Sequence, residues 1–314
     1  MLAVLAAAAL WGTTGTAATF APGVGPLAMG AAALGIGGLL QAVIAAPALA
    51  KEHAAVRARS GTVLAGALAV AVYPLAFYSS MHLAGVAVGT VVSLGSAPLA
   101  SGLLERVVDG RPLDRRWMIA AALGIAGSAV LCGAKMRGTP DAALPTIAGV
   151  GVGLVAGFTY ALYSWCVHRL LVRGVGRAAA MGSVFGAGGL ALMPVLVLTG
   201  APLLATAQSA AVGTYMALVP LFLGYVLFGM GLTRIPASTA TTLTLAEPAI
   251  AATLAVLVVG ERLPALGWAG LAGIGASLAL LALSPGGHQE NGTHRWPEAH
   301  TESAPGPTIP APGA

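Results

Sequence analysis

Ten stretches of about 20 mostly apolar residues follow one another along this chain, with short connections between them. A stretch of this length spans the hydrocarbon core of a bilayer as a helix. Backbone groups in lipid must be hydrogen-bonded within a helix or a closed barrel, and the alternating pattern of barrel strands is missing from the sequence. The sequence therefore predicts an all-α integral membrane protein with ten transmembrane helices, at residues 2–20, 27–49, 61–81, 84–105, 117–134, 145–167, 178–199, 210–232, 237–259 and 264–283.

Charged residues are too few to cover a water-soluble surface. Asp, Glu, Lys and Arg make up 8% of the 314 residues, against about 25% in an ordinary soluble domain. The formal net charge of +5 comes from basic residues in short clusters between the apolar stretches, not from one patch. Such clusters are typical of signals that orient membrane helices, so we expect a lipid bilayer as partner and no nucleic acid.

The basic residues also predict an orientation. Alternate connections hold 11 Lys and Arg on one side and three on the other. Because Lys and Arg gather in cytoplasmic loops, both termini are expected in the cytoplasm of a multi-pass protein of the inner (plasma) membrane. The richer side has Lys51, Arg57, Arg59, Arg106, Arg111, Arg115, Arg116, Arg169, Arg173, Arg177 and Arg234, and the poorer side has Lys135, Arg137 and Arg262.

The two ends of the chain differ from each other. Residues 1–20 have no positive segment at their start, so we interpret them as the first span, although a cleaved signal peptide is the alternative. Residues 285–314 are rich in Pro, Gly, His and Glu, which predicts a disordered cytoplasmic tail. The tail's histidines, at 288, 294 and 300, lack a regular metal-binding spacing, and no metal or other cofactor is expected.

A shift of 150 residues aligns the two halves of the chain. The segment SLGSAPLASGLLERVVDGRPL from Ser93 lies over LTLAEPAIAATLAVLVVGERL from Leu243, with Pro98 on Pro248 and Gly110 on Gly260. Five helices in each half would place the halves in opposite orientations, the inverted repeat found in many secondary transporters. We expect repeats at residues 1–135 and 145–284; chance alignment of Ala- and Leu-rich sequence is the alternative.

The aligned residues resemble the drug/metabolite transporter superfamily, and within it the EamA-type ten-helix exporters. The segment AEPAIAATLAVLVVGERLPALGWAGLAGIGASLALLAL, from Ala246 to Leu283, is similar to the family's signature. In the first half, Gly110–Leu113 stand where the family has its Gly-Glu-Arg-Leu turn, but the Glu is missing. An arginine often seen early in the family's second helix is also absent. The resemblance implies a basket of ten helices around a central cavity and export of amino acids, metabolites or drugs.

Glu247 is the sharpest candidate for function. It is the one acidic residue expected near the middle of the membrane, where a charge costs at least about 2.5–3.5 kcal/mol. A protonated carboxyl group avoids part of that cost, so Glu247 is a candidate proton carrier or partner for a cationic substrate group. A hydrogen bond to a neighbouring helix, for structure alone, is the alternative. Pro248 and its counterpart Pro98 predict helix kinks that free backbone carbonyls.

Other candidate substrate-binding residues are aromatic or polar. Aromatic walls with polar tips suit a mostly apolar solute, although tyrosines near helix ends are often interfacial anchors. His82 is a candidate gate or pH sensor, or simply an interfacial histidine. Ser96 precedes Pro98 and has carbonyls or substrate as possible partners. The set is Trp11, Tyr73, Tyr78, His82, Ser96, Tyr160, Tyr163 and Tyr225.

Two structural predictions complete the sequence argument. Glu105, Asp109 and Glu261 lie at helix ends beside arginines, which predicts surface ion pairs. Glycines at 149, 153 and 157 recur every four residues, which predicts a close helix contact.

The motifs of membrane metalloproteases, P-loop ATPases and serine hydrolases are missing, so we expect a non-enzymatic secondary transporter of a small molecule, with protons as candidate coupling ion. Solute import, a membrane-embedded enzyme, a pore and a scaffold subunit are the alternatives, and the sequence does not specify the oligomeric state.

Overall fold

The computed structural model describes residues 1–84, 86–135, 143–258 and 264–283, and within these ranges every regular element is a helix. The elements are α1 (Leu2–Trp11), α2 (Thr14–Thr19), α3 (Pro26–Gly30), the π-helix η1 (Ala31–Ile36), α4 (Gly37–Lys51), α5 (His53–Arg57), α6 (Ser60–Ala84), α7 (Val86–Val108), α8 (Arg115–Lys135), α9 (Ala143–Val172), α10 (Arg177–Thr199), the 3-10 helix η2 (Ala201–Leu204), α11 (Ala207–Met216), the π-helix η3 (Ala217–Leu223), α12 (Gly224–Leu232), α13 (Ala237–Leu243), α14 (Ala246–Val258) and α15 (Ala265–Ala282).

The helical, apolar character expected from the sequence is confirmed. Six described segments are long and apolar enough to cross a membrane: Pro26–Lys51, Ser60–Ala84, Gly89–Val108, Leu144–Val172, Arg177–Thr199 and Ala207–Leu232. Two shorter apolar helices cover Leu2–Ala18 and Ala265–Leu281. The other two expected spans correspond to α8 and to the broken helix α13/α14, so the total of ten remains a prediction. The expected tail and Glu261 lie outside the described residues.

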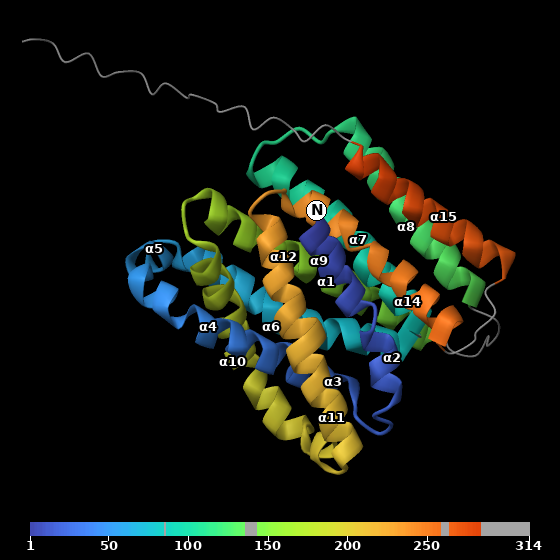
Figure 1. The fold of residues 1–314 in the computed structure, drawn as a ribbon, viewed down its shortest axis with the longest axis horizontal. Helices are drawn as coiled ribbons and strands as arrows, with labels where there is room; N and C mark the ends of the chain where they lie inside the picture. Colours follow the sequence, from blue (N-terminus) through green and yellow to red (C-terminus); the bar gives the residue numbers. More distant parts are fainter. Residues whose placement is uncertain (85, 136–142, 259–263, 284–314) are drawn as a thin grey trace, which may run out of the picture. The chain divides into compact units, whose positions relative to one another are not determined.

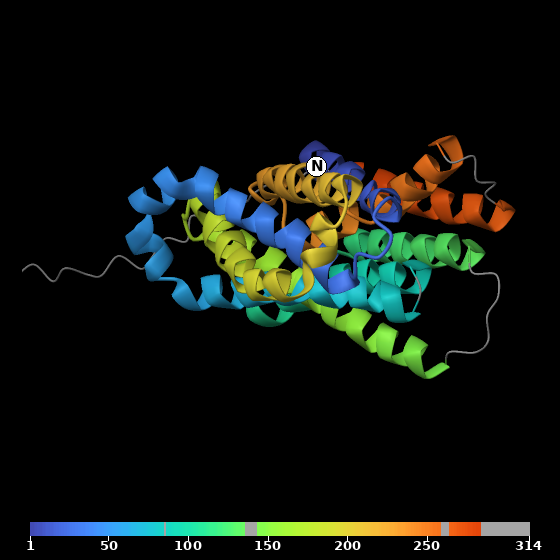
Figure 2. The same ribbon diagram turned by 90° about the horizontal axis from the view of Figure 1, so that it is seen from below.

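The helices pair in a consistent way between the two halves of the chain. α4 packs along α10, and α8 packs along α15 (Figures 1 and 2). α9 lies against both α6 and α7. The glycine face expected on α9 forms these contacts, because a Cβ at Gly153 would lie 2.7 Å from the Ser80 hydroxyl oxygen and one at Gly157 would lie 2.6 Å from the Ser93 carbonyl oxygen. The predicted close helix contact is therefore confirmed.

Two of the long segments contain a π-helix, which the sequence pattern did not indicate. η1 and η3 pack against each other, and η3 contains Pro220. A π-turn leaves carbonyls displaced from their usual partners, and side chains from other helices bind them here. The Trp11 indole Nε1 donates to the Pro220 carbonyl at 2.9 Å, and the Gln41 amide Nε2 donates to the Phe222 carbonyl at 2.9 Å. Both bonds bind carbonyls of η3, so η3 is fixed by side chains from other helices.

Two expected spans are broken instead of continuous. The first divides at Gly12 and Thr13 into α1 and α2, and the ninth divides at Thr244 and Leu245 into α13 and α14. The second break lies just before Pro248, which occupies the first turn of α14, where a missing N–H leaves no backbone bond unmade. In contrast, α7 continues through Pro98.

Candidate functional site

Side chains from two other helices, α7 and α8, hold α13 in place. The buried Glu105 carboxylate at the end of α7 accepts hydrogen bonds from the backbone N–H of Ser238, at 2.9 Å, and from the Ser238 hydroxyl, at 2.6 Å. The Trp117 indole on α8 donates to the Thr242 hydroxyl at 3.1 Å. The surface ion pair expected for Glu105 is therefore wrong: this carboxylate caps the start of α13.

Local hydrogen bonds explain the break between α13 and α14. The Thr244 hydroxyl donates to the Thr241 carbonyl at 2.8 Å and accepts from the Tyr160 hydroxyl at 2.9 Å. Pro248 cannot donate to the Thr244 carbonyl, which accepts from the Glu247 N–H at 2.9 Å instead. Threonine hydroxyls that bind nearby carbonyls compete with the helix ladder, so the chain tightens into a turn before α14 begins.

The two helix breaks meet at Glu247. A Cβ added at Gly12 would lie 3.1 Å from the Glu247 carbonyl oxygen and 3.1 Å from Cγ2 of Ile250. A glycine here lets the break between α1 and α2 lie against the first turn of α14 without strain, whereas a methyl group would require its neighbours to shift slightly. The Glu247 side chain is half-buried and lies at the wall of a cavity.

This cavity, which we call the central cavity, has a volume of about 30 Å³. That is about the share of one water molecule in the liquid, so an organic solute does not fit in the conformation described. Its walls come from the segments around both helix breaks and both π-helices, and from α3, α6 and α12. The lining residues are Trp11, Thr14, Gly30, Ala33, Leu34, Tyr73, Pro74, Phe77, Tyr78, Leu221, Tyr225 and Glu247.

Three polar groups of the central cavity lack partners. Among the described residues, the Glu247 carboxylate and the hydroxyls of Tyr73 and Tyr78 form neither a hydrogen bond nor an ion pair. These three side chains are half-buried and line the cavity, so their polar tips are free to bind a solute there. A few convergent polar groups in an otherwise apolar, aromatic pocket are the usual features of a small-molecule site.

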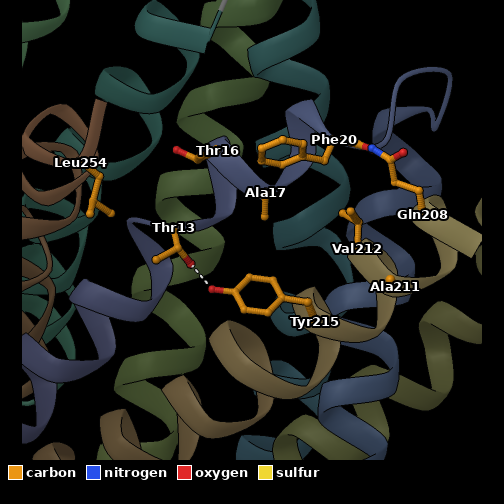
Figure 3. A pocket seen from close by; sticks show the side chains of 9 residues that line it. All are labelled: Thr13, Thr16, Ala17, Phe20, Gln208, Ala211, Val212, Tyr215 and Leu254. Atoms are coloured by element: carbon orange, nitrogen blue, oxygen red, sulfur yellow. Dashed lines mark hydrogen bonds between the residues drawn. The ribbon is translucent and has the colours of Figure 1, made fainter. Parts of the chain in front are cut away.

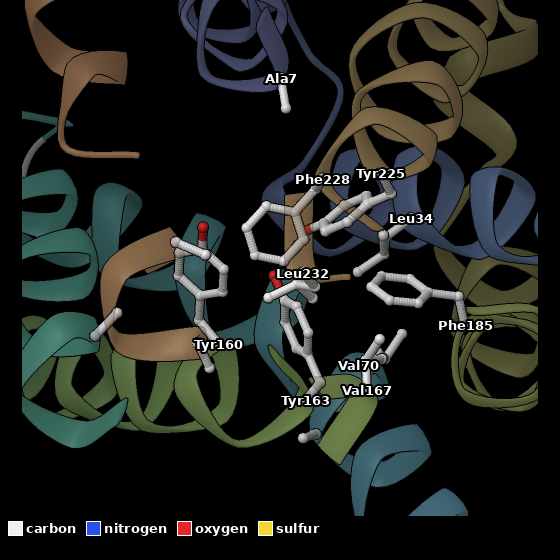
Figure 4. Close-up of a cluster of buried hydrophobic side chains, with 14 of the residues drawn as sticks. Ala7, Leu34, Val70, Tyr160, Tyr163, Val167, Phe185, Tyr225, Phe228 and Leu232 are labelled. Carbon is white, nitrogen blue, oxygen red and sulfur yellow. Dashed lines mark hydrogen bonds between the residues drawn. The ribbon is translucent and has the colours of Figure 1, made fainter. Parts of the chain in front are cut away.

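Buried aromatic side chains, among them Tyr163, Phe185 and Tyr225, form a packed layer beside the cavity (Figure 4). The hydroxyls of Tyr163 and Tyr225 are hydrogen-bonded at 2.7 Å. The Tyr225 ring lies 4.5 Å from that of Phe185 and 4.9 Å from that of Trp11, between ring centroids. Rings at such distances attract one another beyond their buried area. This layer is therefore a packed barrier, and its polar tips are already satisfied by one another.

A second hollow, of about 510 Å³, lies between α2, α11 and α14. The Thr13 and Tyr215 hydroxyls are hydrogen-bonded across it at 2.8 Å, and Leu254 of α14 lies on its wall (Figure 3). Thr13 lines this hollow, whereas the next residue, Thr14, lines the central cavity. The segment that follows the break in the first helix therefore separates the two spaces.

The structure brings together most of the candidate residues, but not all of them. Trp11, Tyr73, Tyr78, Tyr225 and Glu247 line the central cavity, and Tyr160 and Tyr163 pack beside it. His82 is exposed on the last turn of α6. The Ser96 hydroxyl donates to the Val92 carbonyl at 2.6 Å and contacts Gly157, away from the cavity.

Sequence reasoning missed seven of the twelve lining residues, among them the polar Thr14 and the aromatic Phe77. The available signals were a polar residue three positions after Trp11 for the first, and an aromatic four positions after Tyr73 for the second.

Comparisons with known proteins cover nearly the whole described chain. The family model described as the EamA-like transporter family matches residues 1–133 and 147–283. The chain is 34% identical over 285 residues to the "Uncharacterized transporter YwfM" of Bacillus subtilis, covering 90% of this chain and 94% of that protein. It is 26% identical over 289 residues to the "Probable terminal-alkyne amino-acid exporter" of Streptantibioticus cattleyicolor, covering 85% and 92%.

A solved structure described as "Crystal structure of protein" is similar with a TM-score of 0.72 at 20% identity, covering 90% of this chain and 96% of that one. At this identity the likeness shows a shared fold and nothing about substrate.

Proposed function

The chain belongs to the EamA-like transporter family of multi-pass membrane proteins, and from this premise we propose that it is a secondary transporter that exports a small amine-bearing solute by alternating access. Amino acids, related metabolites and drugs are the solutes of this class. The resemblance to the drug/metabolite transporter superfamily is confirmed by the family match and by relatives named as a transporter and an exporter. The substrate class rests on the site described above.

We propose that the ten helices form two inverted repeats of five, with both termini in the cytoplasm. Three observations support this arrangement. The family model matches two consecutive segments of similar length. The basic residues favour alternate connections. Helices at corresponding positions pair with each other, as α4 does with α10 and α8 with α15, which is the pattern that a pseudo-two-fold axis in the membrane plane produces.

The unpartnered carboxylate of Glu247 is the observation that carries the functional proposal. It lies where two broken helices meet, as in transporters whose sites are built from discontinuous helices. A carboxylate in this position binds either a proton or an ammonium group, and the two compete for the same oxygens. Competition of this kind couples entry of a proton to exit of a cationic group. The faces of Tyr73, Tyr225 and Trp11 add cation–π attraction for the ammonium.

Alternating access requires the central cavity to enlarge, because its present volume admits about one water. We propose that α2 and α14 move apart on the side of the 510 Å³ hollow, with rupture of the Thr13–Tyr215 hydrogen bond. The aromatic layer around Tyr163 and Tyr225 opens in the alternate state. The Thr13–Tyr215 contact and the aromatic layer each consist of few side chains, so each can open without unfolding a helix.

The proposal is tested in proteoliposomes with an imposed pH gradient and a panel of radiolabelled amino acids. Wild-type protein is expected to show saturable, gradient-driven transport and counterflow. Glu247→Gln keeps the shape of the side chain and removes its acid, so gradient-driven transport is expected to be lost. Asp114→Asn, an exposed acid in the connection between α7 and α8, is the matched control and is expected to retain it.

Two outcomes contradict the proposal. Non-saturable flux without counterflow indicates a pore. Unchanged gradient-driven transport by Glu247→Gln removes this carboxylate from the coupling step. Loading the gradient in both directions also decides between export and import.

A further inference from the structure

A hollow outside the transport site lies where α7 and α9 both end. It has a volume of about 360 Å³ and is lined mainly by charged and polar side chains: Asp109, Arg111, His168, Arg169 and Arg173, with Val108 and Val172. Val108 and Val172 are the last residues of two segments apolar enough to span a membrane. The hollow therefore lies at the level where apolar helix gives way to charge, which is the depth of lipid headgroups.

Internal contacts neutralise one of the three arginines. The Asp109 carboxylate accepts from Arg169 at 2.8 Å and from the Trp165 indole Nε1 at 2.7 Å. Arg169 also lies over the Trp165 ring, with Cζ 4.7 Å from the ring centroid. These three side chains form one wall of the hollow, in which the Asp109 carboxylate is paired with Arg169 and Trp165 and, among the described residues, not with the other arginines.

Two positive charges remain on the other walls. Among the described residues, the guanidinium groups of Arg111 and Arg173 have no ion pair or hydrogen bond. Beside them, Nδ1 of His168 lies 3.0 Å from the Leu232 carbonyl oxygen, so Nδ1 donates. Nε2 of His168 is buried without a partner among the described residues. The hollow thus offers two forked cationic donors, from Arg111 and Arg173.

We propose that this hollow binds a phosphate-bearing anion, held chiefly by Arg111 and Arg173. Guanidinium forks match phosphate oxygens in pairs, and basic pockets between membrane helices on the cytoplasmic side bind anionic headgroups. The same chemistry is presented by the headgroup of an anionic phospholipid and by a soluble phosphate. A bound anion would tie the end of α7 to the end of α9, since Arg111 follows the first helix and Arg173 follows the second.

The test uses the full-length protein purified in detergent with phosphatidylcholine, and it has two arms. Retention of phosphatidylglycerol is measured by native mass spectrometry. Binding of inorganic phosphate, against chloride at equal ionic strength, is measured by tryptophan fluorescence, which Trp165 reports. The site variant is Arg111→Gln/Arg173→Gln. The matched control is Arg57→Gln/Arg177→Gln, which removes two exposed arginines that do not line the hollow.

Binding by the site variant is expected to be weaker by about tenfold or more in at least one arm, with the control unchanged, because each basic residue near a headgroup contributes measurably to affinity. An effect on phosphatidylglycerol alone assigns the site to lipid, and an effect on inorganic phosphate assigns it to the phosphate group itself. The proposal is overturned if the wild type binds neither probe, or if the site and control variants bind equally. These outcomes do not depend on transport activity.

Discussion

A shift of 150 residues aligns the sequence of α7 with that of the broken helix α13/α14, and the two regions differ at the residue before the aligned proline. α7 carries Ala97 before Pro98 and continues as one helix, and Ala97 is fully buried. The second half carries Glu247 before Pro248 and is broken just upstream. A proline in each half is therefore not what breaks the helix. The second half adds Thr244, whose hydroxyl takes a backbone carbonyl and receives Tyr160.

The two regions also differ in how tightly they pack against their neighbours. α7 lies on α9 with its backbone in contact with glycines, whereas α14 meets α1 at a looser approach beside a cavity. A tightly packed helix pair resists displacement, and a pair beside a hollow has room to move. We infer that α7 and α9 form the fixed part of the molecule and that α14 and α2 form the part that moves.

The largest effect is expected from removing the contact that ties the two regions together. Glu105→Ala leaves the Ser238 N–H and hydroxyl at the start of α13 without their acceptor. Two hydrogen bonds to a charged group are lost, so the free energy of unfolding is expected to fall by about 3 kcal/mol. Thermal unfolding followed by tryptophan fluorescence measures the loss. Asp114→Ala is the exposed control, and an equal loss in both variants would refute the capping role.

The second-largest effect is expected at the tightly packed contact between α7 and α9. Gly157→Ala forces a methyl group onto Ser96 and the Ser93 carbonyl, which is expected to cost about 1–3 kcal/mol of stability. Gly151→Ala on the same helix meets no atom within 4 Å and serves as the control. The same unfolding assay applies. If both variants are equally stable, α7 and α9 are not the fixed part.

The corresponding change where the break between α1 and α2 meets α14 is expected to act on transport more than on stability. The methyl group of Gly12→Ala would lie 3.1 Å from the Glu247 carbonyl oxygen and from Ile250. Small displacements of neighbours accommodate it, at a stability cost below about 1 kcal/mol, whereas a displaced site lowers the transport rate by about tenfold. Gly15→Ala, with open space around it, is the control. A large loss of stability without loss of transport would contradict the distinction between the two sides.

The smallest effect on stability is expected at the unpartnered hydroxyls. Tyr73→Phe removes a group that bonds to nothing in the described residues, so stability stays within about 0.5 kcal/mol. Tyr163→Phe removes the bond to Tyr225 and costs about 1 kcal/mol. Transport measured alongside is expected to fall for Tyr73→Phe. Equal stability losses for the two variants would show that Tyr73 has a structural partner.

Much of the fold follows from features that act locally. Runs of apolar residues predict helices, and the four-residue spacing of Gly149, Gly153 and Gly157 predicts a contact face, because each depends on residues close in sequence. The same holds for Glu247, whose charge inside an apolar run identifies it before its neighbours are known.

What the sequence could not predict depends on partners far along the chain. The acceptor role of Glu105 is set by Ser238, 133 positions away. The π-helices η1 and η3 lie in stretches that are apolar on all faces, so an extra residue in a turn leaves no mark on the periodicity. Ser96 and His82 were plausible site residues by type, and only the packing of α7 and the end of α6 places them elsewhere.

The most direct measurement of the central claim is proton release on substrate binding. An amino acid that binds the purified protein is added in weakly buffered detergent solution below neutral pH, and a pH indicator records the protons released. If proton and ammonium compete for Glu247, the wild type releases up to about one proton per bound solute, and Glu247→Gln releases none. Release by Glu247→Gln equal to that of the wild type would contradict the account.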